Sequence, residues 1–307
     1  MQTILITGGT GLVGEALTAA LLAKNYKIIV LTRSLHGKQE EKHLSYALWD
    51  TKKQYLDLSV ITKADYIIHL AGAGVVDKRW TDSYKKEILE SRTRSSQLIV
   101  DSLKNSANNV KAVICASATG WYGADKQANA SFAESDAAAD DFLGNTCKEW
   151  EASIEPVAVL GKRLVKLRTG IVLSTRGGAL AEFKKPLQFG IAAILGTGRQ
   201  MVSWIHIDDL CNLYIAAIEN EKLSGSYNAV APNPVSNKKL TVTLAKALNK
   251  KLYISLHVPA FILKLIMGQS SIEVLKSTTV NCQKILNTGF KFLHSVIETA
   301  IQGLVKR

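Results

Sequence analysis

The sequence has few cysteines and no long apolar run. Its four cysteines, Cys115, Cys147, Cys211 and Cys282, stand far apart without paired spacing, which argues against a zinc site and against a disulfide framework. A membrane span needs about 18 uninterrupted apolar residues, and the sequence has no such stretch. The first residues read as a core strand rather than a signal peptide. These absences predict a globular protein of the cytoplasm with reduced, mainly buried thiols.

Positive charge exceeds negative charge, with 38 Lys and Arg against 26 Asp and Glu and a formal net charge of +12. The lysines are scattered along the chain rather than gathered with interleaved aromatic residues, and no nucleic-acid motif accompanies them. We therefore expect a solvated basic surface and no nucleic-acid partner. The same excess would steer anionic ligands toward a cleft.

The opening segment TILITGGTGLVG, residues 3–14, joins an apolar run to a glycine cluster and then to a helical stretch. Glycines at three-residue intervals allow a tight turn, a close approach of the backbone to a pyrophosphate and close packing of helix on strand. The N–H groups of the helix start would face the anion. A purely structural turn is the alternative. The expected cofactor contacts in this segment are Gly8, Thr10, Gly11, Leu12, Val13 and Gly14.

Strands and helices alternate along the next 155 or so residues, as expected of a chain this long. The patterns predict strands at 27–32, 44–49, 64–72, 110–117 and 162–168, and helices at 82–103 and 141–154. Such alternation is typical of a parallel sheet with helices on both faces. The predicted fold class is therefore α/β, a Rossmann-like doubly wound parallel sheet.

The alternation breaks after residue 168. Residues 177–198 mix glycines with an apolar helical stretch, residues 204–218 predict a short strand and a helix, and residues 251–256 predict a further strand. We expect a dinucleotide-binding domain at 1–230, with about 175–203 contributing to a cap, and a small C-terminal α/β cap domain at 231–307. The cap would cover the C-terminal ends of the parallel strands, where open sheets bind ligands.

The end of the second predicted strand indicates which dinucleotide binds. NAD-binding units place Asp or Glu there, whereas this strand ends in Arg33 and Ser34, which suit a 2′-phosphate. This favours NADP(H) over NAD(H), the alternative being a solvent-facing arginine. Asp50 would contact the adenine or serve as an ordinary turn residue. Further cofactor contacts are expected at the strand ends, from Leu70, Ala71, Gly72 and Gly170.

Several longer motifs carry a resemblance to a known family. They are SATGWYG at 117–123, RTGIVL at 168–173, GTGRQ at 196–200, WIHIDDL at 204–210 and TGFKF at 288–292. With the glycine turn, they make the chain resemble the extended short-chain dehydrogenase/reductase superfamily. More narrowly, it resembles the YfcH-like branch of NAD(P)-dependent epimerase/dehydratase family proteins, an atypical group.

The resemblance implies a Tyr and a Lys one helical turn apart, with the ammonium lowering the pKa of the phenol. The helix expected to carry them, 141–151, has no tyrosine. Alignment places Leu143 at the tyrosine position and Cys147 at the lysine position. Tyr122 and Lys126 have the right spacing, but a glycine between them predicts a loop, where this spacing does not bring side chains together.

The remaining candidates for proton transfer follow the 110–117 strand. Ala118 occupies the position at which the superfamily usually has Ser or Thr, and Ser117 and Thr119 flank it. Tyr122 is the best single candidate for a proton donor, with a packing aromatic as the alternative. The expected catalytic residues are thus Tyr122, Ser117 and Thr119.

Three residues near position 200 are expected to line the cleft between sheet and cap. Arg199, Gln200 and Trp204 suit the diphosphate and the base or sugar of a nucleotide sugar; a buried turn joining the two lobes is the alternative. Arg92 would contact phosphate or substrate, or form a surface salt bridge. His206 is expected to be structural, and no metal site is expected.

Two functional hypotheses follow. The first is an NADP(H)-dependent oxidoreductase or epimerase-like enzyme acting on a nucleotide sugar or another small carbonyl or hydroxyl compound, without the usual Tyr/Lys pair. The second is a non-catalytic NADP(H)-binding protein whose cofactor-dependent shape a partner reads. A homodimer fits either hypothesis, and neither involves a membrane.

Overall fold

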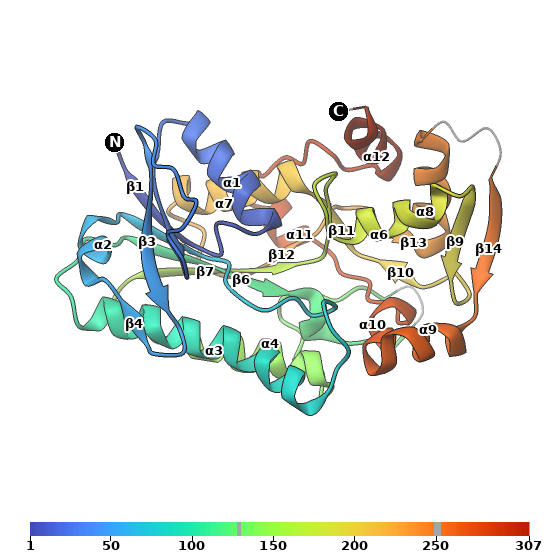
Figure 1. Cartoon of the computed structure of the whole chain (residues 1–307), viewed down its shortest axis with the longest axis horizontal. Coiled ribbons are helices and arrows are strands. Elements are labelled where there is room, and N and C mark those ends of the chain that lie inside the picture. The colour runs from blue at the N-terminus through green and yellow to red at the C-terminus, as the bar shows by residue number, and fades with distance from the viewer. Residues whose placement is uncertain (128–129, 249–252, 307) are drawn as a thin grey trace.

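An eight-stranded sheet forms the centre of the computed structural model, which describes residues 1–127, 130–248 and 253–306 (Figure 1). All neighbouring strands are parallel except β3 and β4, which form an antiparallel pair. In spatial order the strands are β12 (Gly225–Ala229), β7 (Arg163–Thr169), β6 (Ala112–Ala118), β5 (Tyr66–His69), β1 (Thr3–Thr7), β2 (Lys27–Thr32), β3 (Leu44–Asp50) and β4 (Tyr55–Leu56).

Helices cover both faces of this sheet, as predicted. Figure 1 shows α1 (Leu12–Ala23) and α7 (Ile207–Glu219) on one face, and α2 (Leu58–Lys63), α3 (Asp82–Lys104) and α4 (Phe142–Ile154) on the other. The short α5 (Pro156–Val159) follows α4. Strand β1 shows why both faces are covered: Ile4 and Ile6 pack into one core cluster, and Leu5 into the other. Alternate residues of a strand point to opposite faces, so an all-apolar strand requires two cores.

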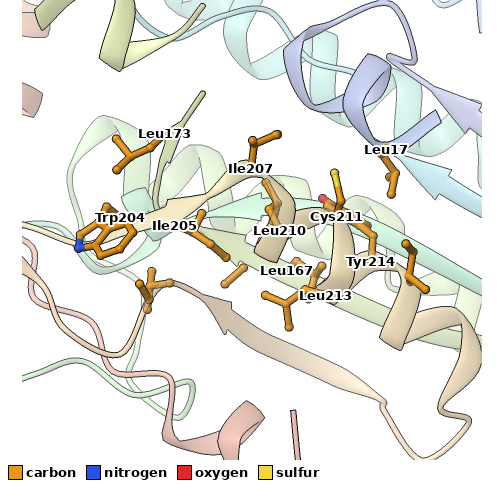
Figure 2. Close-up of a cluster of buried hydrophobic side chains, with 14 of the residues drawn as sticks. Leu17, Leu167, Leu173, Trp204, Ile205, Ile207, Leu210, Cys211, Leu213 and Tyr214 are labelled. Atoms are coloured by element: carbon orange, nitrogen blue, oxygen red, sulfur yellow. The ribbon is translucent and has the colours of Figure 1, made fainter. Parts of the chain in front are cut away.

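The core on the α1 and α7 face extends toward the C-terminal half of the chain. Figure 2 shows Leu17 of α1, Leu167 of β7, and Leu210 and Tyr214 of α7 in one buried cluster with Trp204. Packing between α1 and α7 thus ties the first helix of the chain to a helix nearly 200 residues later. The glycine turn before α1 therefore rests on a fixed support.

The smaller sheets lie outside the main one. They pair β8 (Ile171–Leu173) with β11 (Trp204–His206), β9 (Ile191–Leu195) with β14 (Ile254–Val258), and β10 (Met201–Val202) with β13 (Val235–Ser236). The helical elements around them are α6 (Ala179–Leu187), α8 (Asn237–Ala247), α9 (Ala260–Met267), α10 (Ser271–Leu275), α11 (Gln283–Leu286) and α12 (Ile297–Val305), with a short 3₁₀ turn η2 (Gly268–Ser270).

The pairing of β9 with β14 joins residues from the 175–203 segment to the C-terminal segment. Figure 1 places β9, β14, α8 and α9 together at one end of the molecule. A cap shared between the two segments agrees with this pairing, and the division near residue 230 stays a prediction. The predicted strand at 251–256 is found at Ile254–Val258; residues 251 and 252 lie outside the described residues.

Two further expectations concern the whole chain. All four cysteines are free and buried, which confirms the expectation of buried thiols without disulfides. Across the described residues, no helix combines the length and the apolar character needed to cross a bilayer.

Gly14 gives a direct test of how α1 packs on β1. A Cβ atom at Gly14 would lie only 2.2 Å from the carbonyl oxygen of Gly8, a backbone atom that cannot move aside cheaply. Overpacking of this kind costs about 1–3 kcal/mol, so we expect Gly14→Ala to lower the free energy of unfolding by at least that much. Urea denaturation measures the effect.

Gly303 is the matched control, because it also lies inside a helix and a Cβ there would meet no atom within 4 Å. Replacing a helical glycine by alanine in open space stabilises by roughly 0.5–1 kcal/mol. Gly303→Ala should therefore be neutral or stabilising. Equal stabilities for the two variants would show that α1 does not depend on the contact with Gly8.

Candidate functional site

The glycine turn between β1 and α1 brings the ends of two neighbouring strands together. Gly8 has φ +69°, a conformation that L side chains rarely adopt, and a Cβ there would lie 2.9 Å from the carbonyl carbon of Leu70. A Cβ at Gly14 would meet the carbonyl oxygen of Gly8. Backbone packing alone therefore requires glycine at both positions. The loop therefore passes close over the C-terminal end of β5 and enters α1 directly.

Gly11 differs from these two glycines. It is exposed, it is the N-cap of α1 without a side-chain cap, and a Cβ there would meet only the Gly8 oxygen at 3.4 Å. The first N–H groups of a helix have no partner within the helix. Because Thr10 and Gly11 are exposed beside them, the turn can accept an anion.

The residues at the ends of β2 and β3 have distinct environments. Arg33 is exposed and forms no ion pair among the described residues, and the Ser34 hydroxyl accepts only a local hydrogen bond from the N–H of His36 at 3.2 Å. Asp50 accepts hydrogen bonds from the N–H groups of Lys52 at 2.8 Å and Lys53 at 3.1 Å, and the bond from Lys53 is the largest cause of its lowered pKa. This favours the turn-residue alternative for Asp50, whose contact with adenine stays a prediction.

A buried polar cluster fixes the end of β5. The hydroxyl of Thr7 accepts from the N–H groups of Leu70 at 3.1 Å and Ala71 at 3.2 Å, and it lies 2.7 Å from Nδ1 of His69. Burial lowers the pKa of His69 from 6.5 to about 3, so the ring is neutral near pH 7. Sequence reasoning missed Thr7 and His69; both are polar residues that end neighbouring apolar strands.

Tyr122 and Ser117, two of the predicted catalytic residues, belong to one buried hydrogen-bond network. The hydroxyl of Tyr122 donates to Oδ1 of Asn228 at 2.6 Å and accepts from Nη1 of Arg168 at 3.0 Å. The hydroxyl of Ser117 donates to Oε1 of Glu151 at 2.7 Å. Burial raises the pKa of Tyr122 to about 12, although Arg168 opposes the shift. The phenol is therefore protonated and fully engaged, which favours the packing alternative.

Glu151 and Arg168 form the charged centre of this network. Arg168 donates from Nε at 2.8 Å and from Nη2 at 3.1 Å to the two carboxylate oxygens of Glu151, and its guanidinium lies 3.7 Å from the ring centroid of Trp121. A buried pair of this kind is tolerated only with such geometry, and loss of one partner typically costs about 3–5 kcal/mol. Sequence reasoning placed Arg168 in a motif but did not predict the pair.

Helix α4 carries Leu143 and Cys147, the apolar residue and the thiol that the sequence predicts at the superfamily's tyrosine and lysine positions. Leu143 and Cys147 are both buried, and a Cβ at Gly120 would lie 3.2 Å from Cβ of Leu143. Burial raises the pKa of the Cys147 thiol to about 12. Thr119 is half-buried at the start of a 3₁₀ helix, η1 (Thr119–Tyr122), and Lys126 is exposed in a loop beyond it, as predicted.

The residues predicted to bind substrate do not share one environment. Arg199 is exposed, whereas Gln200 is buried and donates from Nε2 to the carbonyl oxygens of Leu195 and Val274. Trp204 is 0% exposed and its indole N–H donates to the carbonyl of Asn233. The latter two fit the alternative of a buried turn joining two lobes, because their polar atoms already have protein partners.

A side chain at Gly170 would collide with protein atoms rather than enter open space. A Cβ there would lie 2.4 Å from the carbonyl oxygen of Ser203, so the close approach of β8 to β11 accounts for this glycine. Its contact with the cofactor stays a prediction.

A cavity of about 720 Å³ lies beside Leu143. Its walls come from α3, α4 and the segment from α9 to α10, and they are largely apolar, with two lysines and two carboxylates. The lining residues are Trp80, Lys85, Asp141, Phe142, Leu143, Lys264, Gly268, Gln269, Ser271, Ile272, Glu273 and Leu275. Because this space adjoins Leu143, which the sequence predicts at the superfamily's tyrosine position, it is the candidate substrate cavity.

His206, Asp208 and His294 bring three possible metal-ligand atoms within 4.8 Å of one another. The N–H of Asp208 donates to Nδ1 of His206, which thereby caps α7, and the two imidazole rings stack at 3.7 Å. Asp209 accepts from the N–H groups of Leu293 and His294. These contacts tie α7 to the C-terminal segment and agree with a structural role for His206.

Comparison with known proteins decides the family. The model of the NAD dependent epimerase/dehydratase family matches residues 4–153, and a domain of unknown function, DUF1731, matches residues 258–304. An epimerase family protein of Staphylococcus aureus (strain NCTC 8325 / PS 47) is 37% identical over the whole of both chains. The chain belongs to this epimerase family. Epimerase family protein YfhF of Bacillus subtilis (strain 168) is 32% identical to it, over 99% of this chain and 98% of its own.

Solved structures agree with this membership. The human epimerase family protein SDR39U1 (isoform 2), whose crystal structure is with NADPH, superposes on the epimerase-family chain with a TM-score of 0.86 and 26% identity over all of both chains. A nucleoside-diphosphate sugar epimerase from Corynebacterium glutamicum has a TM-score of 0.78 and 32% identity, over 99% of this chain and 58% of that one. The resemblance and the Rossmann-like α/β fold predicted from the sequence are therefore confirmed, and the epimerase-family chain is of the NAD(P)-binding kind.

The low pKa of His69 predicts how the stability of this epimerase-family chain depends on pH. The unfolded chain takes up a proton at this residue near pH 6.5, whereas the folded chain does so only near pH 3. The contribution of His69 to the free energy of unfolding is thus fully present above pH 6.5. Between pH 6.5 and about 3, where only the unfolded state is protonated, it falls by about 1.4 kcal/mol for each unit by which the pH decreases.

Urea denaturation between pH 7 and pH 5 measures this slope. His69→Asn should flatten it, while His36→Gln, which changes an exposed histidine, should leave it as in the wild type. A slope unchanged by His69→Asn would mean that His69 is not held neutral in the folded chain.

Proposed function

We propose that this epimerase-family chain binds NADP(H) and acts as an oxidoreductase or epimerase-like enzyme on a nucleotide sugar or another small carbonyl or hydroxyl compound. One observation carries the proposal: the uncapped start of α1 at Gly11, with the exposed Arg33 at the end of the neighbouring strand β2. Together they offer one place for a pyrophosphate and another for a 2′-phosphate.

The residues of the glycine turn fit a dinucleotide. Gly8 and Gly14 shape the loop, and the N–H groups at the start of α1, from Leu12 and Val13 onward, would hold the pyrophosphate beside Thr10 and Gly11. Arg33 and Ser34 would hold the 2′-phosphate, since a guanidinium fork matches phosphate geometry. When bound, NADP(H) supplies or accepts a hydride.

The nicotinamide end of the site would lie where β5 ends. Leu70 and Ala71 are fixed there by Thr7, and Gly72 follows them without a side chain. Support for NADPH in particular comes from the human relative, whose crystal structure contains it. We propose the same preference here on the strength of Arg33.

The substrate would occupy the cavity beside Leu143, with the exposed Arg199 as a further contact. The Corynebacterium glutamicum relative, a nucleoside-diphosphate sugar epimerase at 32% identity, supports a nucleotide sugar. Among the proposed proton donors, Thr119 has no side-chain hydrogen bond within the described part of the chain. Tyr122 and Ser117 would have to give up the bonds described above before acting.

A second candidate function rests on the same helix α4. Because Leu143 and Cys147 stand at the superfamily's tyrosine and lysine positions and Tyr122 is engaged elsewhere, the standard acid/base pair is missing. A non-catalytic NADP(H)-binding protein that a partner recognises fits this observation. Turnover of NADPH with pooled carbonyl compounds, or epimerisation of pooled nucleotide sugars, would exclude it.

Fluorescence titration with NADPH and NADH tests the cofactor assignment. We expect the wild type to prefer NADPH, and Arg33→Ala to lose affinity for NADPH while keeping that for NADH. A hydrogen bond to a charged group contributes about 1.5–3 kcal/mol, which corresponds to a roughly 10- to 150-fold weaker affinity.

Lys27→Ala is the control, because it removes an exposed cation from the other end of the same strand. It should leave both affinities unchanged. Equal affinity of the wild type for the two dinucleotides would contradict the role of Arg33, and binding of neither would remove the proposed function.

A further inference from the structure

Arg92 lies on α3 where three elements meet. A Cβ placed on Gly72, just after β5, would lie 3.2 Å from the guanidinium carbon of Arg92, and that carbon lies 5.0 Å from the ring centroid of Trp150 on α4. Figure 1 shows α3 and α4 running side by side beneath the sheet. The guanidinium is therefore held between the end of β5 and helix α4.

The guanidinium uses few of its donor groups. Nη1 donates to the carbonyl oxygen of Ile88 at 2.8 Å, one turn earlier in α3, and the guanidinium makes no other hydrogen bond within the described residues. An arginine carries five N–H donors in a planar fork. The indole N–H of Trp150 is also buried without a partner. Both sides of this contact thus carry donors that lack acceptors.

The positive charge of Arg92 has no counter-charge either. No carboxylate of residues 1–127, 130–248 or 253–306 lies within 4.0 Å of it, whereas Arg168 is paired with Glu151 and Arg94 with Glu90. Desolvation is the main cause of the lowered pKa of Arg92, and only Cys147 and Tyr84 oppose it. A partly buried cation without an anion is costly, which makes Arg92 a candidate for binding an anionic ligand. The surface salt bridge considered for Arg92 is not formed with any described residue.

The neighbours of Arg92 place it at the proposed reaction site. Gly72 ends the segment expected to approach nicotinamide. The positive charge of Arg92 opposes the rise in the pKa of Cys147 that burial causes, and Cys147 is predicted at the superfamily's lysine position. A positive charge is thus present near that position, but it comes from α3 instead of α4.

We propose that Arg92 is the binding subsite for an oxyanion group of the substrate, a carboxylate or a phosphate. This inference rests on the proposed function, because it assigns the anion to the substrate rather than to NADP(H). The unused N–H donors of the fork would accept two oxygens of such a group side by side. The substrates favoured are then carbonyl or hydroxyl compounds that carry a negative charge near the reacting carbon.

Arg92 would orient the substrate without moving a proton. A guanidinium holds its proton at any pH near neutrality, so it attracts negative oxygen but cannot act as the missing general acid. The proton would have to come from another group or from water. In this chain, one group would supply the positive charge and another the proton. The superfamily combines the two roles in its Tyr/Lys pair.

Titration of the NADP⁺-saturated protein with oxalate and, separately, with inorganic phosphate tests the subsite. Saturating NADP⁺ keeps both probes out of the glycine turn, and tryptophan fluorescence reports binding because Trp150 contacts Arg92. The neutral diamide of oxalate controls for charge. Saturable binding of oxalate alone, of phosphate alone or of both would support the subsite and identify the group it prefers.

The variants are Arg92→Gln, Arg92→Lys and the matched control Arg94→Gln, an exposed arginine two residues further along the same helix. We expect Arg92→Gln to weaken binding of the oxyanion probe at least about tenfold, Arg92→Lys to restore part of it, and Arg94→Gln to leave it unchanged. The NADPH affinity of all three variants should stay within about twofold of the wild type.

Three results would overturn the proposal: no binding of either probe by the wild type, unchanged probe binding in Arg92→Gln, or an equal loss of NADPH affinity in that variant. Failure of the proposed function is distinct, since it appears as absent NADPH binding in the wild type. If Arg92→Gln fails to fold, phenylglyoxal labelling of the wild type decides. Oxalate or phosphate should slow the modification of Arg92 and leave that of Arg94 unchanged. If Arg92 is modified at the same rate with and without the probes, the proposal is overturned.

Discussion

The close approach of α1 to the end of β1 is the constraint on which the site depends. Gly8 and Gly14 allow backbone to meet backbone at this point, and no other residue type fits at Gly14 without displacing the carbonyl of Gly8. The approach directs the open N-terminus of α1 over the ends of β1 and β5. Packing of α1 against α7 then fixes the position of α1.

Polar residues beneath the sheet ends fall into two groups with different roles. Thr7 and His69 are neutral and saturate the backbone where the chain leaves β5, whereas Glu151 and Arg168 form a charged pair that holds Tyr122 and Ser117. Both groups are buried and satisfied, so they shape the site without offering free donors to a ligand. Arg92 and Arg33 are the contrasting cases, because neither forms an ion pair with a carboxylate among the described residues.

Sequence reasoning identified the first strand, turn and helix because their pattern is local. It also predicted β2, β3, β5, β6 and β7, each a short segment rich in apolar residues. It missed β12, whose residues GSYNA carry no strong pattern, because pairing with β7 at the sheet edge stabilises it. Trp204 was predicted at the cleft but lies in the core: a sequence does not show whether an aromatic residue faces a ligand or another helix. The Glu151–Arg168 pair joins α4 to β7, a tertiary contact that no spacing reveals.

The central claim is that the open start of α1 holds the pyrophosphate of a dinucleotide. Hydrogen–deuterium exchange of the backbone amides at residues 8–14, with and without NADPH, tests it most directly. We predict that NADPH slows exchange at the first turn of α1, because its N–H groups gain phosphate acceptors. Exchange that stays unchanged there while NADPH slows it elsewhere in the chain would contradict the account.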